Sequence, residues 1–555
     1  MRVQPTSRNR RGDMRSTRAR NRRNPPPVEK GGLRWAIWAS CGIVSLSCVP
    51  YLIAYAIAPP GYKFIGLGAN VDDASVYLSW MRQAADGHFF IRNLFTTEPQ
   101  VAHGFNFLFF VLGVFARLTH LPLIAVFHLA RIASGLGLLL AVYGFAGIWL
   151  KDLRSKRIAL LVVGLSAGFG WLYFVPKTII QPVDNWQHEA FTFLSIYLSP
   201  LLVFPMLMML GALYFLLRFT ETGRWKHAAY AGVILLFLSN IHGYDVITVG
   251  ITWAFYAIYE LARRRNLRPV VGGLAAALIA APAAAYQVHF YLTEAVFRER
   301  VGVGTYTMAF GWYIVGYGLL LPLAAFGAWK AYKSRTDVGL LVCWVVAAFV
   351  GAYLPVSFQR KLISGTHIPL SLLATIGIVG LVKLLPSRFR TVSTAALIVL
   401  MMPSSFAFMA RDIARIAGNE SNTTAHVPFI SKGELAALDY LRKNTGPNDV
   451  ILSPCGLAVL IPGYTGRCVY YGHWGETVRF SDKLFEAAAL YMPRTPDVSR
   501  YLFLRSRGIT YVVGYHFASD LSVDMVDFGR QPLPFLIPVF DSKDVGVYRV
   551  ANGTP

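Results

Sequence analysis

Two adjacent carboxylates, Asp72 and Asp73, are the first residues along the chain whose type and spacing suggest chemistry. Such a pair can take a proton from an acceptor hydroxyl, orient the acceptor, or share a divalent ion such as Mg²⁺ or Mn²⁺, so the metal requirement stays open. Beside a low-dielectric boundary we expect the pKa of Asp73 to rise toward neutrality, which suits a general base. The structural alternative is that Asp73 only caps the helix that follows it.

The segment after this pair has the pattern of a helix lying on a membrane surface. Its apolar side chains recur at helical spacing on one side, at Val76, Tyr77, Trp80, Met81 and Ala84. Its polar side chains fall opposite, at Ser75, Ser79, Arg82 and Gln83. This placement sets the two carboxylates at the N-terminus of a helix on the outer face.

A second candidate feature is the cationic pair Arg360 and Lys361, in the segment from Phe358 to Pro369. The pair falls at the outer end of an apolar span, against the usual preference of basic residues for the cytoplasmic side. A phosphate or pyrophosphate explains it, because Arg offers a fork to phosphate oxygens and Lys a point charge. Anchoring to lipid head groups is the structural alternative.

The second and third outer loops add polar side chains that suit contact with a sugar or a metal. They are Asp184, His188 and Glu189 in the loop from Val175 to Pro200, and His242 in the short loop from Asn240 to Asp245. Their spacing matches no defined metal motif, so structural polar contacts explain them as well.

The C-terminal region supplies a last group, His473, Trp474 and Glu476. These residues are candidates for binding the acceptor, with Trp474 stacking on a sugar face, although an ordinary core or turn explains them too. The same region holds Cys455 and Cys468, which can form a disulfide only in an oxidising compartment.

The composition shows which elements must position these groups. Of 555 residues, 55% are hydrophobic and 15% are charged. Apolar runs of about 17 to 25 residues recur from Trp35 to Ala410, and each matches the thickness of a bilayer. The chain is therefore a polytopic membrane protein. Its formal charge of +24 lies mainly in the N-terminal tail and in short turns, which argues against nucleic-acid binding.

Five short basic loops set the topology, because basic loops stay in the cytoplasm. They are 151–157, 218–227, 263–268, 330–335 and 385–390. They predict eleven spans, with the N-terminus inside and the C-terminus outside: 35–58, 121–150, 158–174, 201–217, 228–240, 245–262, 269–292, 305–330, 338–354, 368–385 and 391–410. The apolar segment from Phe105 to Leu118 is too short to span, so we expect it to be re-entrant or interfacial.

Three regions follow from these patterns. Residues 1–34 carry eleven Lys or Arg and should form a disordered cytoplasmic tail. Residues 35–410 should form an α-helical membrane domain with a long first outer loop at 59–120. Residues 411–555 alternate short helical and extended patterns, which predicts an extracytoplasmic α/β domain.

This organisation resembles the GT-C class of integral-membrane glycosyltransferases. The segments 72–82 and 359–370 look like the acidic and basic loop elements of that class, and 447–476 looks like outer domains of uncharacterised bacterial members. The resemblance implies transfer of a sugar from a polyprenyl-phosphate carrier to a glycan, lipid or protein on the outer face of a bacterial plasma membrane. The C-terminal region has no WWD-like signature of oligosaccharyltransferases, which argues against protein N-glycosylation.

On this hypothesis Asp73 is the general base, Asp72 orients the acceptor or shares a divalent ion, and Arg360 with Lys361 binds the donor phosphate. The alternatives are a transporter or flippase for lipid-linked glycans and a non-catalytic scaffold for envelope assembly. A transporter usually shows an internal repeat and a midplane site, and neither is found here. A scaffold or flippase tolerates neutral residues at positions 72 and 73, whereas a transferase does not.

Overall fold

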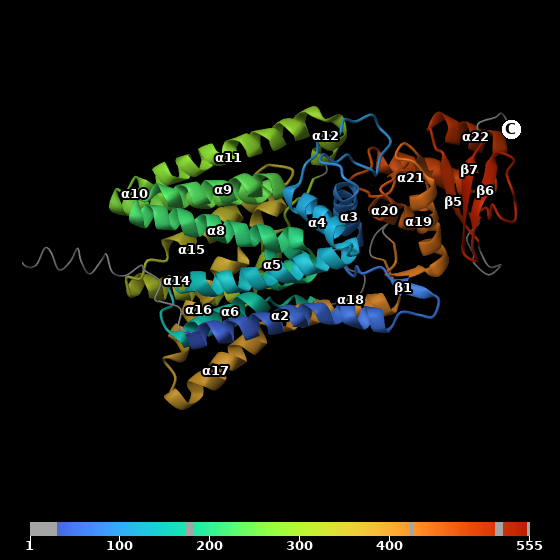
Figure 1. Cartoon of the computed structure of the whole chain (residues 1–555). Helices are drawn as coiled ribbons and strands as arrows, with labels where there is room; N and C mark the ends of the chain where they lie inside the picture. The colour runs from blue at the N-terminus through green and yellow to red at the C-terminus, as the bar shows by residue number, and fades with distance from the viewer. Residues whose placement is uncertain (1–29, 174–180, 303, 422–425, 517–524, 552–555) are drawn as a thin grey trace, which may run out of the picture.

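The computed structural model describes residues 30–173, 181–302, 304–421, 426–516 and 525–551, and the predicted tail lies almost wholly outside them. A bundle of long helices forms one part of the molecule and a sheet region forms the other (Figure 1). The helices of the first part are α2 Lys30–Ala56, α3 Val71–Ala85, α4 Phe107–Thr119, α5 Leu123–Ala146, α6 Leu153–Leu165, α7 Thr192–Leu198, α8 Pro200–Thr222, α9 Trp225–Ile241, α10 Gly243–Arg264, α11 Arg268–Thr293, α12 Ala295–Gly302, α13 Phe310–Tyr317, α14 Leu320–Lys333, α15 Gly339–Ala352, α16 His367–Val382, α17 Ser387–Leu400 and α18 Pro403–Ala417. Short 3-10 turns lie at η1 Gly170–Tyr173, η2 Val183–Asn185, η3 His188–Ala190 and η4 Gln359–Ile363.

Helices occupy every predicted span, which confirms a multi-pass membrane protein. Among the described residues, eight spans are long and apolar enough to cross a bilayer, or nine if the pair α13 and α14, bent by 82°, counts as one. The remaining two predicted spans hold α9 with 17 residues and α15 with 14 residues. The short apolar helix α4 occupies the segment expected to be re-entrant or interfacial.

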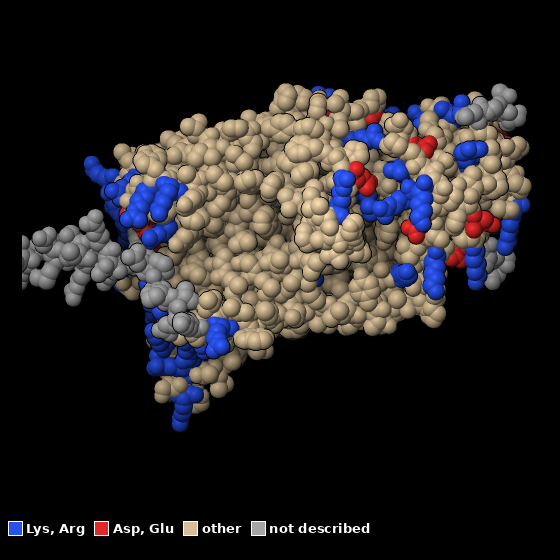
Figure 2. Space-filling model, in the orientation of Figure 1, with Lys and Arg blue, Asp and Glu red and all other residues tan. Residues whose placement is uncertain are grey.

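The surface of the bundle matches a bilayer. Figure 2 shows a broad band without charged side chains between a cluster of Lys and Arg at one end and mixed charges at the other. Large apolar side chains on the helices of the bundle face outward, for example Trp38, Leu274 and Leu278. An exposed apolar surface of this kind marks contact with lipid rather than with water.

The C-terminal region folds around a five-stranded mixed sheet in the order β4-β3-β5-β7-β6. Its strands are β3 Val450–Leu452, β4 Cys468–Val469, β5 Tyr511–Tyr515, β6 Leu536–Asp541 and β7 Val545–Val550, and its helices are α19 Lys432–Asn444, α20 Cys455–Thr465, α21 Phe480–Tyr491 and α22 Asp497–Ser506. The strands β3, β4 and β5 are parallel, whereas β7 runs antiparallel to both β5 and β6. The predicted α/β character is thereby confirmed. Within the described residues, Cys455 and Cys468 are not joined by a disulfide.

The first outer loop and the C-terminal region share one core. Strand β1 (Tyr62–Phe64) pairs antiparallel with β2 (Phe429–Ser431). One buried apolar cluster joins side chains of α3 and α4 to side chains of α20, β3, β5 and β7. Helices α3 and α4 cross closely at Gly113, where a Cβ atom would lie 2.3 Å from the Met81 carbonyl oxygen. Because burial drives this packing, the helix that carries the acidic pair is fixed against the C-terminal region.

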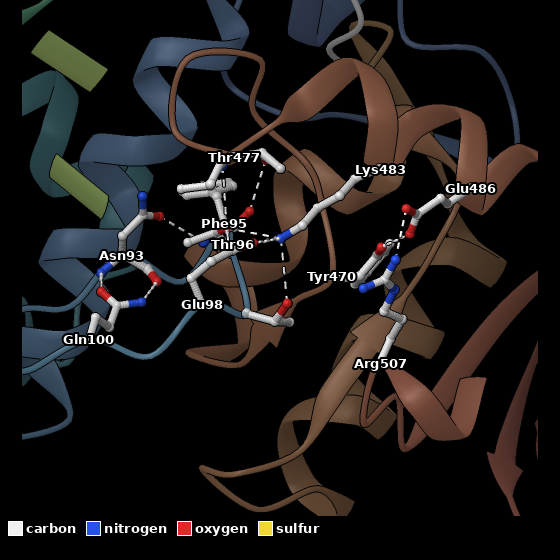
Figure 3. A network of polar contacts seen from close by, with 12 residues as sticks. Asn93, Phe95, Thr96, Glu98, Gln100, Tyr470, Thr477, Lys483, Glu486 and Arg507 are labelled. Carbon is white, nitrogen blue, oxygen red and sulfur yellow. Dashed lines mark hydrogen bonds and ion pairs between the residues drawn. The ribbon is translucent and has the colours of Figure 1, made fainter. Parts of the chain in front are cut away.

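Polar contacts close the same junction (Figure 3). The buried Lys483 ammonium lies 2.7 Å from Glu98 Oε1 and donates to Thr96 Oγ1 at 3.1 Å. Thr477 Oγ1 donates to the Phe95 carbonyl oxygen at 2.8 Å. A buried cation next to a carboxylate and hydroxyls is a well-satisfied arrangement, so the chain around residues 93–98 is held against the segment that follows β4.

Candidate active site

The acidic pair lies in the first turn of α3, as the sequence predicts. Carboxylates are favourable there because the N-terminus of a helix carries partial positive charge. The residue before the helix is Asn70, whose φ of 58° is in the left-handed region. Its amide Nδ2 donates to Asp73 Oδ2 at 3.0 Å, so Asn70 fixes the orientation of that carboxylate.

The two neighbouring carboxylates have different partners. Successive residues of a helix point about 100° apart, so the pair cannot act as one chelating group. Asp72 Oδ2 accepts a hydrogen bond from Trp474 Nε1 at 2.9 Å, and Asp72 is only 4% exposed. Asp73 Oδ1 lies 3.4 Å from His473 Nε2, and its side chain is 40% exposed. Asp73 is therefore the member of the pair that a substrate can reach.

Both partners come from one short segment of the C-terminal region. His473 is 3% exposed, and its Nδ1 accepts the Gly475 N–H at 3.0 Å. This bond directs Nε2 toward Asp73. The ring of Trp474 stacks on that of His473 with centroids 5.5 Å apart. The sequence suggested acceptor binding for His473 and Trp474, and in the structure they contact Asp73 and Asp72.

The electrostatics of Asp73 differ from the expectation. Burial raises the pKa of Asp73, but the contact with His473, the charge of Lys361 and the Asn70 amide outweigh it and hold this pKa well below its ordinary value. Burial opposes the charged form of His473, yet Asp73 raises the pKa of that imidazole. The predicted rise of the Asp73 pKa is therefore wrong. At Asp73, the neighbouring His473 and Lys361 stabilise the charged carboxylate more than burial destabilises it.

The predicted cationic pair lies opposite, in the turn η4. Arg360 Nε lies 3.3 Å from Glu189 Oε1, and the guanidinium carbon lies 4.9 Å from the centre of the Trp186 ring. Lys361 has no ion pair or side-chain hydrogen bond within the described ranges, and its charge acts on both Asp73 and Glu189. Sequence segments more than 280 residues apart thus share one electrostatic environment.

The second outer loop contributes two of its three predicted residues to this environment. Burial raises the pKa of Glu189, but Lys361 and Arg360 lower it to about 2. Burial lowers the pKa of His188 to about 3, and nearby Arg411 and Arg360 reinforce that change. Glu189 is therefore ionised and His188 neutral at ordinary pH, so the loop adds one negative charge to the two cations of η4.

Three predicted residues have structural partners instead. Asp184 is fully buried, and its Oδ2 accepts the N–H groups of Gly168 and Gly170 at 3.2 and 2.9 Å. His242 Nδ1 contacts Asp245 Oδ2 at 2.9 Å, between α9 and α10. Glu476 accepts hydrogen bonds from Asn93 Nδ2 through both its carbonyl oxygen and its carboxylate, at 2.7 and 3.3 Å. These contacts hold loops together.

A cavity lies next to Asp72, and no pattern in the sequence predicted it. Its volume is about 130 Å³, and its polar lining includes Asn70, Arg411 and Arg415. Both arginines are on α18, and in the sequence they follow the last apolar span, where basic residues are common. No periodicity could associate them with the first outer loop, because only folding brings α18 beside it.

The donor set for a metal ion is poor. Across the described residues, no group of three or more His, Cys, Asp or Glu side chains could hold an ion. Asp72 and Asp73 also bind separate partners, Trp474 and His473. These residues do not fit the divalent cation considered from the sequence.

Comparisons with known proteins define the fold. No family model and no curated protein matches the chain. Among solved structures, the oligosaccharyltransferase of Archaeoglobus fulgidus aligns with a TM-score of 0.55 at 13% identity over 86% of this chain and 69% of that one. ArnT from Cupriavidus metallidurans bound to undecaprenyl phosphate aligns with a TM-score of 0.53 at 14% identity over 91% and 97%.

A third similar structure is the arabinofuranosyltransferase AftD from Mycobacteria, with a TM-score of 0.52 at 15% identity. The alignment covers 94% of this chain and 40% of AftD. These likenesses show that the chain has the fold of the GT-C glycosyltransferases, as the resemblance in the sequence implied.

Proposed function

We propose that the protein is a membrane glycosyltransferase that moves a sugar from a polyprenyl-phosphate-linked donor to an acceptor. The observation that carries the proposal is that a substrate-accessible carboxylate, Asp73, lies within the electrostatic reach of Lys361, an ammonium group with no ion pair among the described residues, in a GT-C fold. A base and a phosphate-binding cation are the two groups that this reaction needs.

Asp73 is the group that receives the acceptor proton. His473 cannot take that role, because Nδ1 is occupied by the Gly475 N–H and Nε2 faces Asp73. His473 instead positions Asp73 and keeps it ionised. The low pKa makes Asp73 a weak base when the site is empty. Binding of a phosphate at Lys361 offsets the cation that lowers this pKa, and so raises the basicity of Asp73 when the donor arrives.

The bond changes follow from these positions. The acceptor hydroxyl oxygen forms a bond to the anomeric carbon and gives its proton to Asp73. The bond from the anomeric carbon to the phosphate oxygen breaks, and the polyprenyl phosphate leaves with the electron pair. Lys361 and Arg360 stabilise the negative charge on that leaving group. Glu189 holds Arg360 in place, at 3.3 Å.

The lipid carrier and the membrane face are part of the proposal. Solved structures of similar fold contain dolichol phosphate in the Archaeoglobus fulgidus oligosaccharyltransferase and undecaprenyl phosphate in ArnT, which supports a lipid-linked donor. Another contains an acceptor peptide, so glycan, lipid and protein acceptors all stay within the proposal. Figure 2 shows Lys and Arg clustered at the end of the bundle away from the sheet region, which supports a plasma-membrane protein with a cytoplasmic N-terminus and an outer C-terminal domain.

The test is transfer of radiolabelled sugar from a pool of polyprenyl-phosphate donors to endogenous acceptors in membranes that contain the protein. Asp73→Asn should reduce labelled product about a thousandfold, because it removes the base but keeps the side-chain shape. Asp86→Asn is the matched control, since Asp86 is at the other end of α3 and its side chain is 36% exposed. The control should retain full activity.

Immunoblots must show equal amounts of each variant. Full transfer by Asp73→Asn would exclude the assignment of the base. Absence of labelling with wild-type protein across all donors would instead favour the flippase and scaffold alternatives, in which Arg360 and Lys361 bind a lipid phosphate without reaction.

A further inference from the structure

A cavity is lined by residues 68–72 of the first outer loop and by the end of α18. Its volume is about 130 Å³, and Asp72 and Asn70 line one side. Trp186 and His188 of the second outer loop, Phe408, Arg411 and Arg415 of α18, and Glu420 line the rest. The cavity is distinct from the contact between Asp73 and His473, because Asp72 and Asp73 point in different directions from α3.

One carboxylate oxygen in the wall has no partner. Asp72 Oδ2 accepts the Trp474 Nε1–H, but Asp72 Oδ1 is buried and makes no hydrogen bond within the described part of the chain. A buried acceptor on a charged group is more costly to leave without a partner than a neutral one, so this oxygen favours a ligand that completes it. The missing partner must donate a hydrogen bond.

The charges of the lining exclude two classes of ligand. Two carboxylates, Asp72 and Glu420, stand against two guanidinium groups, Arg411 and Arg415. Asp412 lies 3.4 Å from Arg415 and offsets that charge further. This balance gives no net attraction for a phosphate, and the polar wall disfavours an apolar chain.

A polyhydroxylated ligand fits both kinds of wall. A carboxylate only accepts hydrogen bonds and a guanidinium only donates them, whereas each hydroxyl does both. The rings of Trp186 and Phe408 add apolar surface for the carbon face of a sugar. For size, an apolar cavity of about 150 Å³ holds one benzene molecule, so this partly open cavity of about 130 Å³ has room for no more than one ring, part of which stays outside it.

We infer that this cavity binds a single uncharged sugar ring, with a ring hydroxyl donating to Asp72 Oδ1. The inference deepens the proposed function and rests on it for the sugar being a substrate. The position also suits the reaction. Trp186 lines the cavity on one side, and the guanidinium of Arg360 lies 4.9 Å from the centre of its ring. The sugar site and Arg360 of the phosphate site are therefore both next to the Trp186 indole.

The test is saturation-transfer NMR of the full chain in lipid nanodiscs, with methyl glycopyranosides and methyl glycofuranosides as single-ring probes. Maltoside detergents must be avoided, because their head groups are sugars. At least one glycoside should show saturation transfer with wild-type protein. Asp72→Asn should weaken binding about tenfold, since the amide offers a donor where the hydroxyl needs an acceptor.

A second variant tests the cavity itself. Ala69 is 8% exposed and lines the cavity, so Ala69→Leu should fill part of it and abolish the signal. The matched control Asp86→Asn, on the same helix but outside the cavity, should keep it. Each variant must elute as a single species in size-exclusion chromatography.

Three outcomes would overturn the inference. They are no glycoside signal with wild-type protein, an unchanged signal in both Asp72→Asn and Ala69→Leu, and displacement of the glycoside by an equal concentration of inorganic phosphate. A signal that depends on Asp72 in a protein without any transfer activity would support the sugar site and contradict the proposed function. In an active protein, a higher KM of Asp72→Asn for the donor or for the acceptor identifies which one carries the ring.

Discussion

Two acidic groups outside the apolar spans, Asp73 in the first turn of α3 and Asp184 in the turn η2, have opposite environments. Asp184 is fully buried, and backbone N–H groups of Gly168 and Gly170 occupy its Oδ2. Asp73 is 40% exposed on its side chain, and its polar partners among the described residues are the side chains of His473 and Asn70. Both residues are carboxylates in the first turn of a helical segment, and the sequence indicated both as candidate site residues.

The difference shows what makes a carboxylate available for chemistry. Backbone N–H groups that a loop leaves unpaired must find an acceptor, and Asp184 serves that need. Burial raises the pKa of Asp184 to about 6, whereas His473 and Lys361 lower that of Asp73. One carboxylate stabilises the fold, and the other is left ionised at a surface that a substrate can reach.

The largest effect that would sharpen this comparison concerns Lys361, whose charge acts on Asp73. Lys361→Met should lower kcat/KM for the lipid-linked donor about a hundredfold, because it removes a charge that stabilises the leaving phosphate. Steady-state transfer kinetics measure this. Lys383→Met is the control, since Lys383 caps the opposite end of α16. Equal kinetics for the two variants would remove Lys361 from the donor site.

Asp184→Ala should lower stability and leave transfer activity unchanged, whereas Asp73→Asn should lower transfer activity. The change leaves two buried N–H groups without an acceptor, which costs about 2 to 6 kcal/mol of unfolding free energy. Thermal unfolding followed by tryptophan fluorescence should show a lower midpoint. Transfer activity per folded molecule should stay close to that of wild type. An Asp184→Ala variant with normal stability and no activity would place Asp184 in the active site and contradict its structural role.

The smallest expected effect concerns His473. Its raised pKa means that its contact with Asp73 stabilises the fold below the unfolded-state value of about 6.5 and is lost as pH rises through the folded-state value. The lowered pKa of Asp73 means that its contribution is present above about 3.9 and is lost as pH falls. Stability from this pair is therefore greatest between those two values.

His473→Gln should flatten that dependence of the unfolding midpoint on pH and reduce transfer about tenfold. His516→Gln is the control, because His516 also contacts two carboxylates, Asp527 and Asp541 at 2.8 and 2.7 Å, away from the site. The control should retain full transfer. If both histidine variants lose equal activity, His473 has no special role in positioning Asp73.

The sequence by itself determined the membrane architecture. Apolar runs of bilayer length are local properties, so the sequence predicts the eight or nine described spans that are long and apolar enough to cross a bilayer. Basic turns between spans are local too, and Figure 2 shows Lys and Arg clustered at one end of the bundle. Helix α3 was predictable for the same reason, because periodicity and the position of an acidic pair at a helix start depend on neighbouring residues only.

Only the tertiary structure decided which groups meet. Asp72 and Trp474 are 402 residues apart, and nothing in either segment specifies the other. The direction of the Asp73 pKa shift depended on His473 and Lys361. The packing of α3 against α20 and the position of the turn η4 bring these two residues near Asp73. Local patterns follow from chain geometry, whereas pKa values and cavities follow from distances across the fold, because electrostatic energies depend on separation in space.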